Sequence, residues 1–99
     1  MKRETVLERK IEKIKHELVK IGEMRPGAVT TQTRKWGGEY GQLSYSHKGK
    51  GHTEYVPAQQ RREVERQTEN YKKFRKLTQE WVELGLELCK LKAKAQIDK

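Results

Sequence analysis

The chain has 99 residues, of which 32% are apolar and 37% are charged, and its formal net charge is +9. This length makes one domain at most, and the apolar content is too low for a compact multilayer core. No apolar run approaches the ~18 residues that span a bilayer, and the basic start lacks the apolar core of a signal peptide. We therefore expect a cytoplasmic protein with no membrane partner. Excess cations favour polyanions such as DNA or RNA, although many small proteins are basic for solubility alone.

Residues 4–21 have the pattern of an amphipathic helix. Their apolar side chains recur in alternating steps of four and three, which is the spacing of a coiled-coil seam. The seam consists of Leu7, Ile11, Ile14, Leu18 and Ile21. Gly22 is placed to cap this helix, and Pro26 prevents its continuation.

Residues 28–56 form the predicted β region. The first six, from Ala28 to Thr33, are rich in hydroxyl and β-branched side chains and predict a short strand. Residues 42–56 predict a β-hairpin, because alternating residues flank a glycine-rich turn, and the pattern leaves its register open by one residue. An isolated hairpin is only marginally stable in water, so this one needs a third strand or a helix to lie on. The start of the following helix, around Val64 and Tyr71, is the expected support.

Residues 57–95 predict a long amphipathic helix, with Pro57 in its first turn. At about 1.5 Å per residue it would be roughly 55–60 Å long, longer than the first helix can cover. Its apolar stripe consists of Val64, Tyr71, Phe74, Leu77, Trp81, Leu84, Leu88, Leu91 and Ala95. The expected fold class is α+β, mainly α, as a single domain over residues 1–99. The uncovered part of the stripe predicts a homodimer through the C-terminal helix.

The sequence indicates no catalytic or metal chemistry. There is no nucleophile accompanied by a base and an orienting carboxylate, so we predict a protein that is not an enzyme and has no cofactor. His47 and His52 flank the hairpin turn and could lie opposite each other, but two histidines alone make a poor metal site. Cys89 is the only cysteine, which excludes an internal disulfide, and we expect it to be a half-buried thiol beside the apolar stripe.

The middle of the chain combines cations with aromatic residues. Cations for phosphates and aromatic faces for bases are the ingredients of nucleic-acid contact. The predicted nucleic-acid-binding residues are Arg34, Lys35 and Trp36 before the hairpin, Lys48 and Lys50 at its tip, and Arg61, Arg62 and Arg66 on the long helix. The alternative is structural: Tyr45 and Tyr55 would form the core of the sheet, the turn lysines would keep it soluble, and the helix arginines would be a solvated face.

Several short motifs lie between Met24 and Leu91: Met24-Arg25-Pro26-Gly27, Tyr40 with Gln42-Leu43-Ser44-Tyr45, Gly49-Lys50, Tyr55-Val56, Glu69-Asn70-Tyr71-Lys72-Lys73-Phe74 and Glu80-Trp81-Val82-Glu83-Leu84. Together they resemble an uncharacterised family of short bacterial and archaeal proteins that are often encoded near transposases and other mobile elements. Typical members have a cysteine cluster with zinc-like spacing where this chain has Arg34 to Glu39, so no metal role is carried over. The setting beside mobile elements implies a nucleic-acid-binding accessory protein.

Two functions are therefore expected from the sequence. The first is a non-catalytic nucleic-acid-binding protein whose basic loop and hairpin contact phosphates. The alternative is an adaptor or inhibitor that acts on a larger nucleoprotein complex through its coiled-coil-like helices and Trp81, with charge used only for steering. The sequence does not distinguish DNA from RNA.

Overall fold

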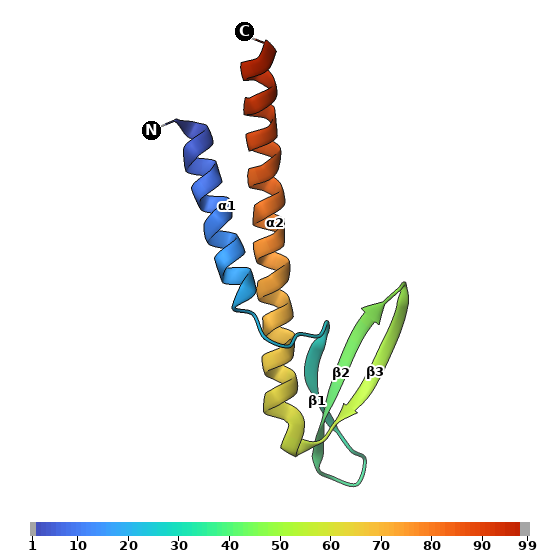
Figure 1. The fold of residues 1–99 in the computed structure, drawn as a ribbon. Helices are drawn as coiled ribbons and strands as arrows, with labels where there is room; N and C mark the ends of the chain where they lie inside the picture. Colours follow the sequence, from blue (N-terminus) through green and yellow to red (C-terminus); the bar gives the residue numbers. More distant parts are fainter. Residues whose placement is uncertain (1, 98–99) are drawn as a thin grey trace. The chain divides into compact units, whose positions relative to one another are not determined.

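The structure is a computed structural model that describes residues 2–97 (Figure 1). Helix α1 (Arg3–Val19) precedes three strands, β1 (Ala28–Thr33), β2 (Glu39–His47) and β3 (Lys50–Val56). A short 3₁₀ turn, Ala58–Gln60, leads directly into the long helix α2 (Arg61–Ile97). The predicted α+β, mainly α fold is confirmed, and β1 has the predicted bounds. None of the helices within residues 2–97 is long and apolar enough to cross a bilayer.

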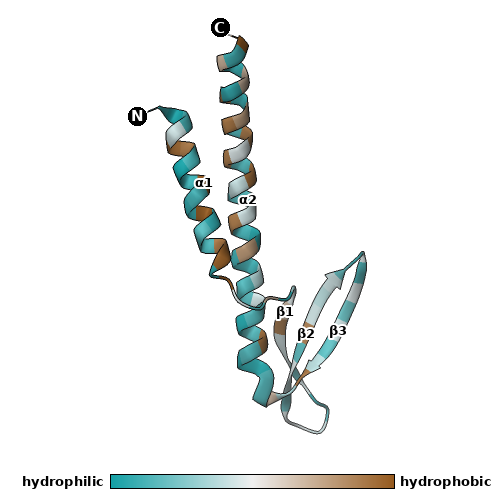
Figure 2. Cartoon of the chain, viewed as in Figure 1, coloured by the Kyte–Doolittle hydropathy of each residue, from teal (hydrophilic) through white to brown (hydrophobic). Residues whose placement is uncertain are grey.

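The chain divides into two compact units, and α2 contributes to both. The sheet unit is Gly22–Lys72, which holds the three strands and the start of α2. The helical unit holds α1 and the part of α2 from Lys73 onward. Figure 2 shows the contrast in composition: the strands are mostly pale or teal, whereas strongly apolar residues recur along both helices.

In the helical unit, α1 and the later part of α2 run antiparallel. Arg3 Nε lies 2.9 Å from Glu87 Oε1, and Lys73 Nζ lies 3.6 Å from Glu17 Oε2, so the N-terminus of α1 lies beside the distal part of α2. The predicted seam of α1 is confirmed in its first part, which is buried. Those buried residues are Leu7, Ile11 and Ile14.

The ends of both helices differ from the predicted bounds of 4–21 and 57–95. Helix α1 ends at Val19, where the hydrogen bonds tighten: the N–H of Lys20 donates to the carbonyl of Glu17, and the N–H of Ile21 donates to the carbonyl of Leu18. Gly22 is therefore not the cap. Pro57 has an extended ψ of 147° and lies before the 3₁₀ turn, so it is outside α2, which then runs on to Ile97.

The sheet unit is an antiparallel sheet of order β1-β2-β3. The predicted hairpin is confirmed, although β2 begins earlier than residue 42. Lys48 and Gly49 both have positive φ, of 53° and 78°, and His47 pairs with Lys50. This is a two-residue turn of the mirror-image class, whose twist matches that of the strands.

One apolar cluster joins the sheet to α2. Leu43 is fully buried between Val56 of β3 and Val64 of α2, with Val29 and Tyr45 packed against them. The prediction that the sheet lies on the start of the helix is confirmed for Val64, whereas Tyr71 is not part of this cluster. A hydrogen bond of 2.8 Å from Asn70 Nδ2 to the carbonyl of Glu23 attaches the preceding segment to the same part of α2.

Candidate nucleic-acid interface

The sheet has one face toward α2 and one face without a covering element of its own unit. Directly paired residues of neighbouring strands share a face, and successive residues alternate between faces. The helix-side face therefore includes the paired Val29, Leu43 and Glu54, together with Gly41 and Val56. The other face, called here the open face, consists of Ala28, Thr30 and Gln32 of β1, Tyr40, Gln42, Ser44 and Ser46 of β2, and Gly51, Thr53 and Tyr55 of β3.

Every residue of the open face is uncharged. The two carboxylates of the strands, Glu39 and Glu54, lie on the helix-side face by the same register. There Glu54 is ion-paired with Arg25. A polyanion on the open face would therefore meet hydroxyl, amide and aromatic groups without a strand carboxylate beside it.

Two tyrosines and an arginine cluster on the open face. The ring centroids of Tyr40 and Tyr55 are 5.9 Å apart with the rings tilted by 42°, and Tyr55 is 60% exposed. The guanidinium of Arg34 lies 5.2 Å from the ring centroid of Tyr40, within the range of a cation–π interaction. This grouping presents planar surfaces and a positive charge side by side.

The loop between β1 and β2 places a further aromatic residue in solvent. The N–H of Arg34 donates to the carbonyl of Gly38 at 3.0 Å, and the N–H of Gly37 donates to the carbonyl of Arg34 at 3.1 Å, which closes the loop. Gly37 and Gly38 both have positive φ, a conformation that glycine adopts without steric cost. Trp36 at the tip of the loop is 84% exposed.

The structure separates the predicted loop residues from the predicted hairpin-tip residues. Arg34 to Trp36 precede β2, whereas Lys48 and Lys50 follow it, so the two groups lie at opposite ends of that strand. Nine extended residues from Glu39 to His47 span about 27 Å. The open face of β2 lies between the two groups.

The predicted arginines of α2 differ in how far they are already neutralised. Arg61 Nε lies 2.9 Å from Glu65 Oε1, and its Nη2 donates to Thr31 Oγ1 at 2.9 Å. Arg66 Nε donates to Glu63 Oε2 at 3.1 Å, a hydrogen bond that raises the pKa of Arg66 and lowers that of the Glu63 carboxyl. Arg62 is exposed and forms no ion pair with any residue in the described range 2–97.

Most of the predicted site residues are cations that remain available. Within the described part of the sheet unit, the cations in no ion pair are Arg34, Lys35, Lys48, Lys50 and Arg62. A phosphate can approach these groups without first displacing a glutamate. Arg61 and Arg66 would have to exchange an existing carboxylate partner before they could contact a phosphate.

Sequence reasoning placed some residues of this region incorrectly. Tyr45 is half-buried against the core, as the structural alternative held, but Tyr55 lies on the open face and not in the core. His47 and His52 are not opposite each other: His47 pairs with Lys50, and His52 stacks on Tyr45 with ring centroids 4.9 Å apart. Cys89 of α2 is exposed, not half-buried. Among the described residues, no group of three or more potential ligands could hold a metal ion.

Comparisons with protein-family models, with curated proteins and with solved structures found no match to this chain. The resemblance to short proteins encoded near mobile elements stays an expectation.

Proposed function

We propose that this protein is a non-catalytic nucleic-acid-binding protein of the cytoplasm that binds a single strand across the open face of its sheet. The observation that carries the proposal is the neutral open face with the Tyr40–Tyr55 pair, bounded at both ends of β2 by cations that have no ion-pair partner among the described residues. Arg34 and Lys35 stand at one end, and Lys48 at the other.

Aromatic exposure favours single strands over duplexes. Bases of a single strand can stack on aromatic side chains, and this stacking is worth ~1–3 kcal/mol per base and tolerates any sequence. In a duplex the base faces are already stacked on one another, so Tyr55 and Trp36 would gain little. The same groups accept DNA and RNA, because every base has a planar face.

Cations at the two ends predict a binding strength that depends on salt. Each phosphate contact with a single strand adds about −0.7 to the slope of log K against log salt, because binding releases condensed counterions. Lys35, Lys48 and Lys50 are exposed and lie in or beside turns. Neutralising one of them should weaken binding similarly for all sequences and should reduce the slope by one contact.

The test is fluorescence anisotropy with labelled single-stranded and double-stranded DNA and RNA at several salt concentrations. Lys35→Gln should lower affinity and reduce the salt slope by ~0.7. Lys72→Gln is the matched control, because Lys72 is an exposed lysine of the same unit that is already 3.3 Å from Glu69 Oε1. Binding that is insensitive to salt, or equal losses in the two variants, would contradict the proposed interface.

A protein–protein adaptor is the second candidate function. It is favoured by the apolar residues that α2 leaves in solvent, since Val82 is 60% and Leu86 is 58% exposed. Recognition would then reside in the helical unit. The substitution pair Val82→Ser and Leu86→Ser would remove partner binding and leave oligonucleotide binding unchanged.

A further inference from the structure

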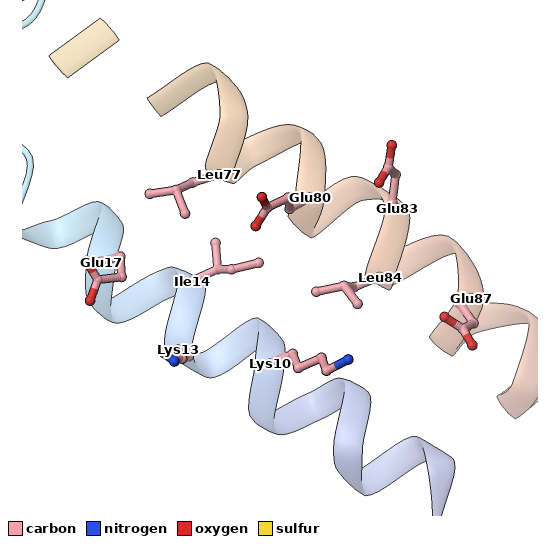
Figure 3. A pocket seen from close by; sticks show the side chains of 9 residues that line it. All are labelled: Lys10, Lys13, Ile14, Glu17, Leu77, Glu80, Glu83, Leu84 and Glu87. Atoms are coloured by element: carbon pink, nitrogen blue, oxygen red, sulfur yellow. The ribbon is translucent and has the colours of Figure 1, made fainter. Parts of the chain in front are cut away.

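The helical unit contains a groove between α1 and α2 that the proposed function does not use. Figure 3 shows its lining side chains, and its volume is about 530 Å³. All of its residues belong to the helical unit. The floor is apolar and is formed by Ile14 of α1 with Leu77 and Leu84 of α2.

Two helices alone do not cover this floor completely. Ile14 is buried, but Leu77 and Leu84 are only half-buried. Within the described part of α2 from Lys73 onward, no apolar side chain is fully buried. A two-helix hairpin has one shared seam and no second layer, so apolar surface beside the seam stays in contact with water.

The two rims of the groove have opposite charge. Lys10 and Lys13 lie on the α1 rim, and Glu80, Glu83 and Glu87 form the α2 rim (Figure 3). Glu17 lies at one end of the α1 rim, where Lys20 Nζ and Lys73 Nζ, at 3.8 Å and 3.6 Å from its carboxylate oxygens, neutralise it. Arg3 already neutralises Glu87 and, through its hydrogen bond, lowers the pKa of that carboxyl. By contrast, Lys13, Glu80 and Glu83 form no ion pair with any residue that the structure describes.

We propose that a second copy of this chain covers the groove, with α1 of each copy against α2 of the other. This is an isologous contact, in which the same surface serves both copies. The two-fold axis of the dimer runs parallel to the helices. Rotation about this axis leaves the position of each residue along the helices unchanged. It therefore places the lysine rim of one copy beside the glutamate rim of the other. An axis across the helices would set lysines against lysines and glutamates against glutamates.

The result is a four-helix bundle built from two hairpins. The apolar floors face each other and form the second layer that a single hairpin lacks. Lys10 and Lys13 then pair with Glu80 and Glu83 of the partner copy, which selects this arrangement over the alternatives. The inference does not depend on nucleic-acid binding, because no groove residue belongs to the sheet unit.

Sedimentation equilibrium on charge-reversed variants tests the pairing. The wild-type chain should be a dimer, and Lys10→Glu with Lys13→Glu should weaken dimerisation by ~10-fold or more, since attraction becomes repulsion at every rim contact. Glu80→Lys with Glu83→Lys should do the same. An equimolar mixture of these two variants should restore dimers, and so should the chain carrying all four substitutions, which exchanges the rims.

The matched control is Lys90→Glu with Lys94→Glu, which makes the same charge change on α2 at residues that do not line the groove. Circular dichroism checks that each variant keeps its helices. If the two variants with a single reversed rim (the half-reversed variants) unfold, the chain with all four substitutions (the fourfold variant) still tests the pairing, because its two rims again have opposite charge. A wild-type chain that stays monomeric at several hundred micromolar, half-reversed variants that dimerise as the wild type does, or a folded fourfold variant that is monomeric would each overturn the proposal.

Discussion

The sheet unit closes its core with one helix, whereas the helical unit leaves its core half open. In the sheet unit, Leu43 is completely buried between a strand and α2. In the helical unit, α1 has buried residues such as Leu7, but the facing leucines of α2 are only half-buried. A sheet is broad enough to cover one side of a helix, and a second helix is not. The core of the sheet unit is thus covered by its own elements. The helical unit leaves apolar surface in contact with water, which a further layer of helices would bury.

The two units also distribute charge differently. In the described part of the sheet unit, the cations without an ion pair lie in or beside turns around a neutral face, except for Arg62 on α2, and this arrangement would suit an extended anion. The helical unit places opposite charges on the two rims of one apolar groove, which suits a copy of itself. The same net positive chain therefore has two surfaces with different expected partners.

The largest expected effect is the loss of a core leucine from the sheet unit. Leu43→Ala removes a fully buried side chain and should cost ~2–5 kcal/mol of unfolding free energy, because it leaves a cavity. Hydrogen exchange should show lost protection in β2 and β3. Val19→Ala, at a residue that is 81% exposed, is the control and should be close to neutral. Equal costs for the two substitutions would contradict the description of the core.

Tyrosine on the open face should matter for binding and not for folding. Tyr55→Ala should weaken single-strand binding by ~1–3 kcal/mol, because one stacking surface is lost. The melting temperature should change little, since the ring is 60% exposed. Anisotropy titrations and thermal melts measure the two effects. A large loss of stability with no loss of affinity would contradict this role and would instead support Tyr55 as part of the core of the sheet.

Two glycine substitutions should have opposite signs in the two units. Gly27 has φ of 124°, and an added Cβ would lie 2.7 Å from the carbonyl oxygen of Ser44, so Gly27→Ala should destabilise the sheet unit by about 1–3 kcal/mol. Gly85 lies inside α2 with open space around it, so Gly85→Ala should stabilise the helix by about 0.5–1 kcal/mol. Chemical denaturation of each variant measures both. A stabilising Gly27→Ala would show that the backbone there is not left-handed.

The smallest expected effect is a dependence on acid. The hydrogen bond from Arg3 lowers the pKa of Glu87, so this pair stabilises the helical unit above the ordinary pKa of glutamate. That contribution disappears as pH falls through the lowered pKa. The difference in melting temperature between the wild type and Arg3→Gln should therefore be present at neutral pH and vanish in acid. It should be small, because both side chains are exposed, and a difference that persists in acid would contradict the pairing.

The sequence pattern predicted the secondary-structure elements better than it predicted which face of the sheet each strand side chain occupies. The fold class, the bounds of β1 and the position of Val64 under the sheet follow from periodicity and turn residues, and the structure confirms them. The face of Tyr55 does not follow, because a shift of one residue in register reverses every side chain of a strand. The turn at Lys48 and Gly49 sets that register, and its type depends on backbone angles that a Lys-Gly pair does not dictate.

Which cations are neutralised was only partly predictable from the sequence. Arg61, Arg62 and Arg66 are all arginines at the start of α2. Of these three, only Arg62 has no carboxylate partner among the described residues. Glutamates three and four residues away could have indicated the pairing of Arg66 with Glu63 and of Arg61 with Glu65. The contact of Arg61 with Thr31 of β1 requires the tertiary fold.

An NMR titration of the 99-residue chain with a short single-stranded oligonucleotide tests the central claim most directly. If the open face is the interface, the amide shifts should change at Thr30, Gln42 and Tyr55 and through the loop from Arg34 to Trp36, while those of α1 stay in place. Shifts confined to α1 and the later part of α2, with the open face unchanged, would contradict it.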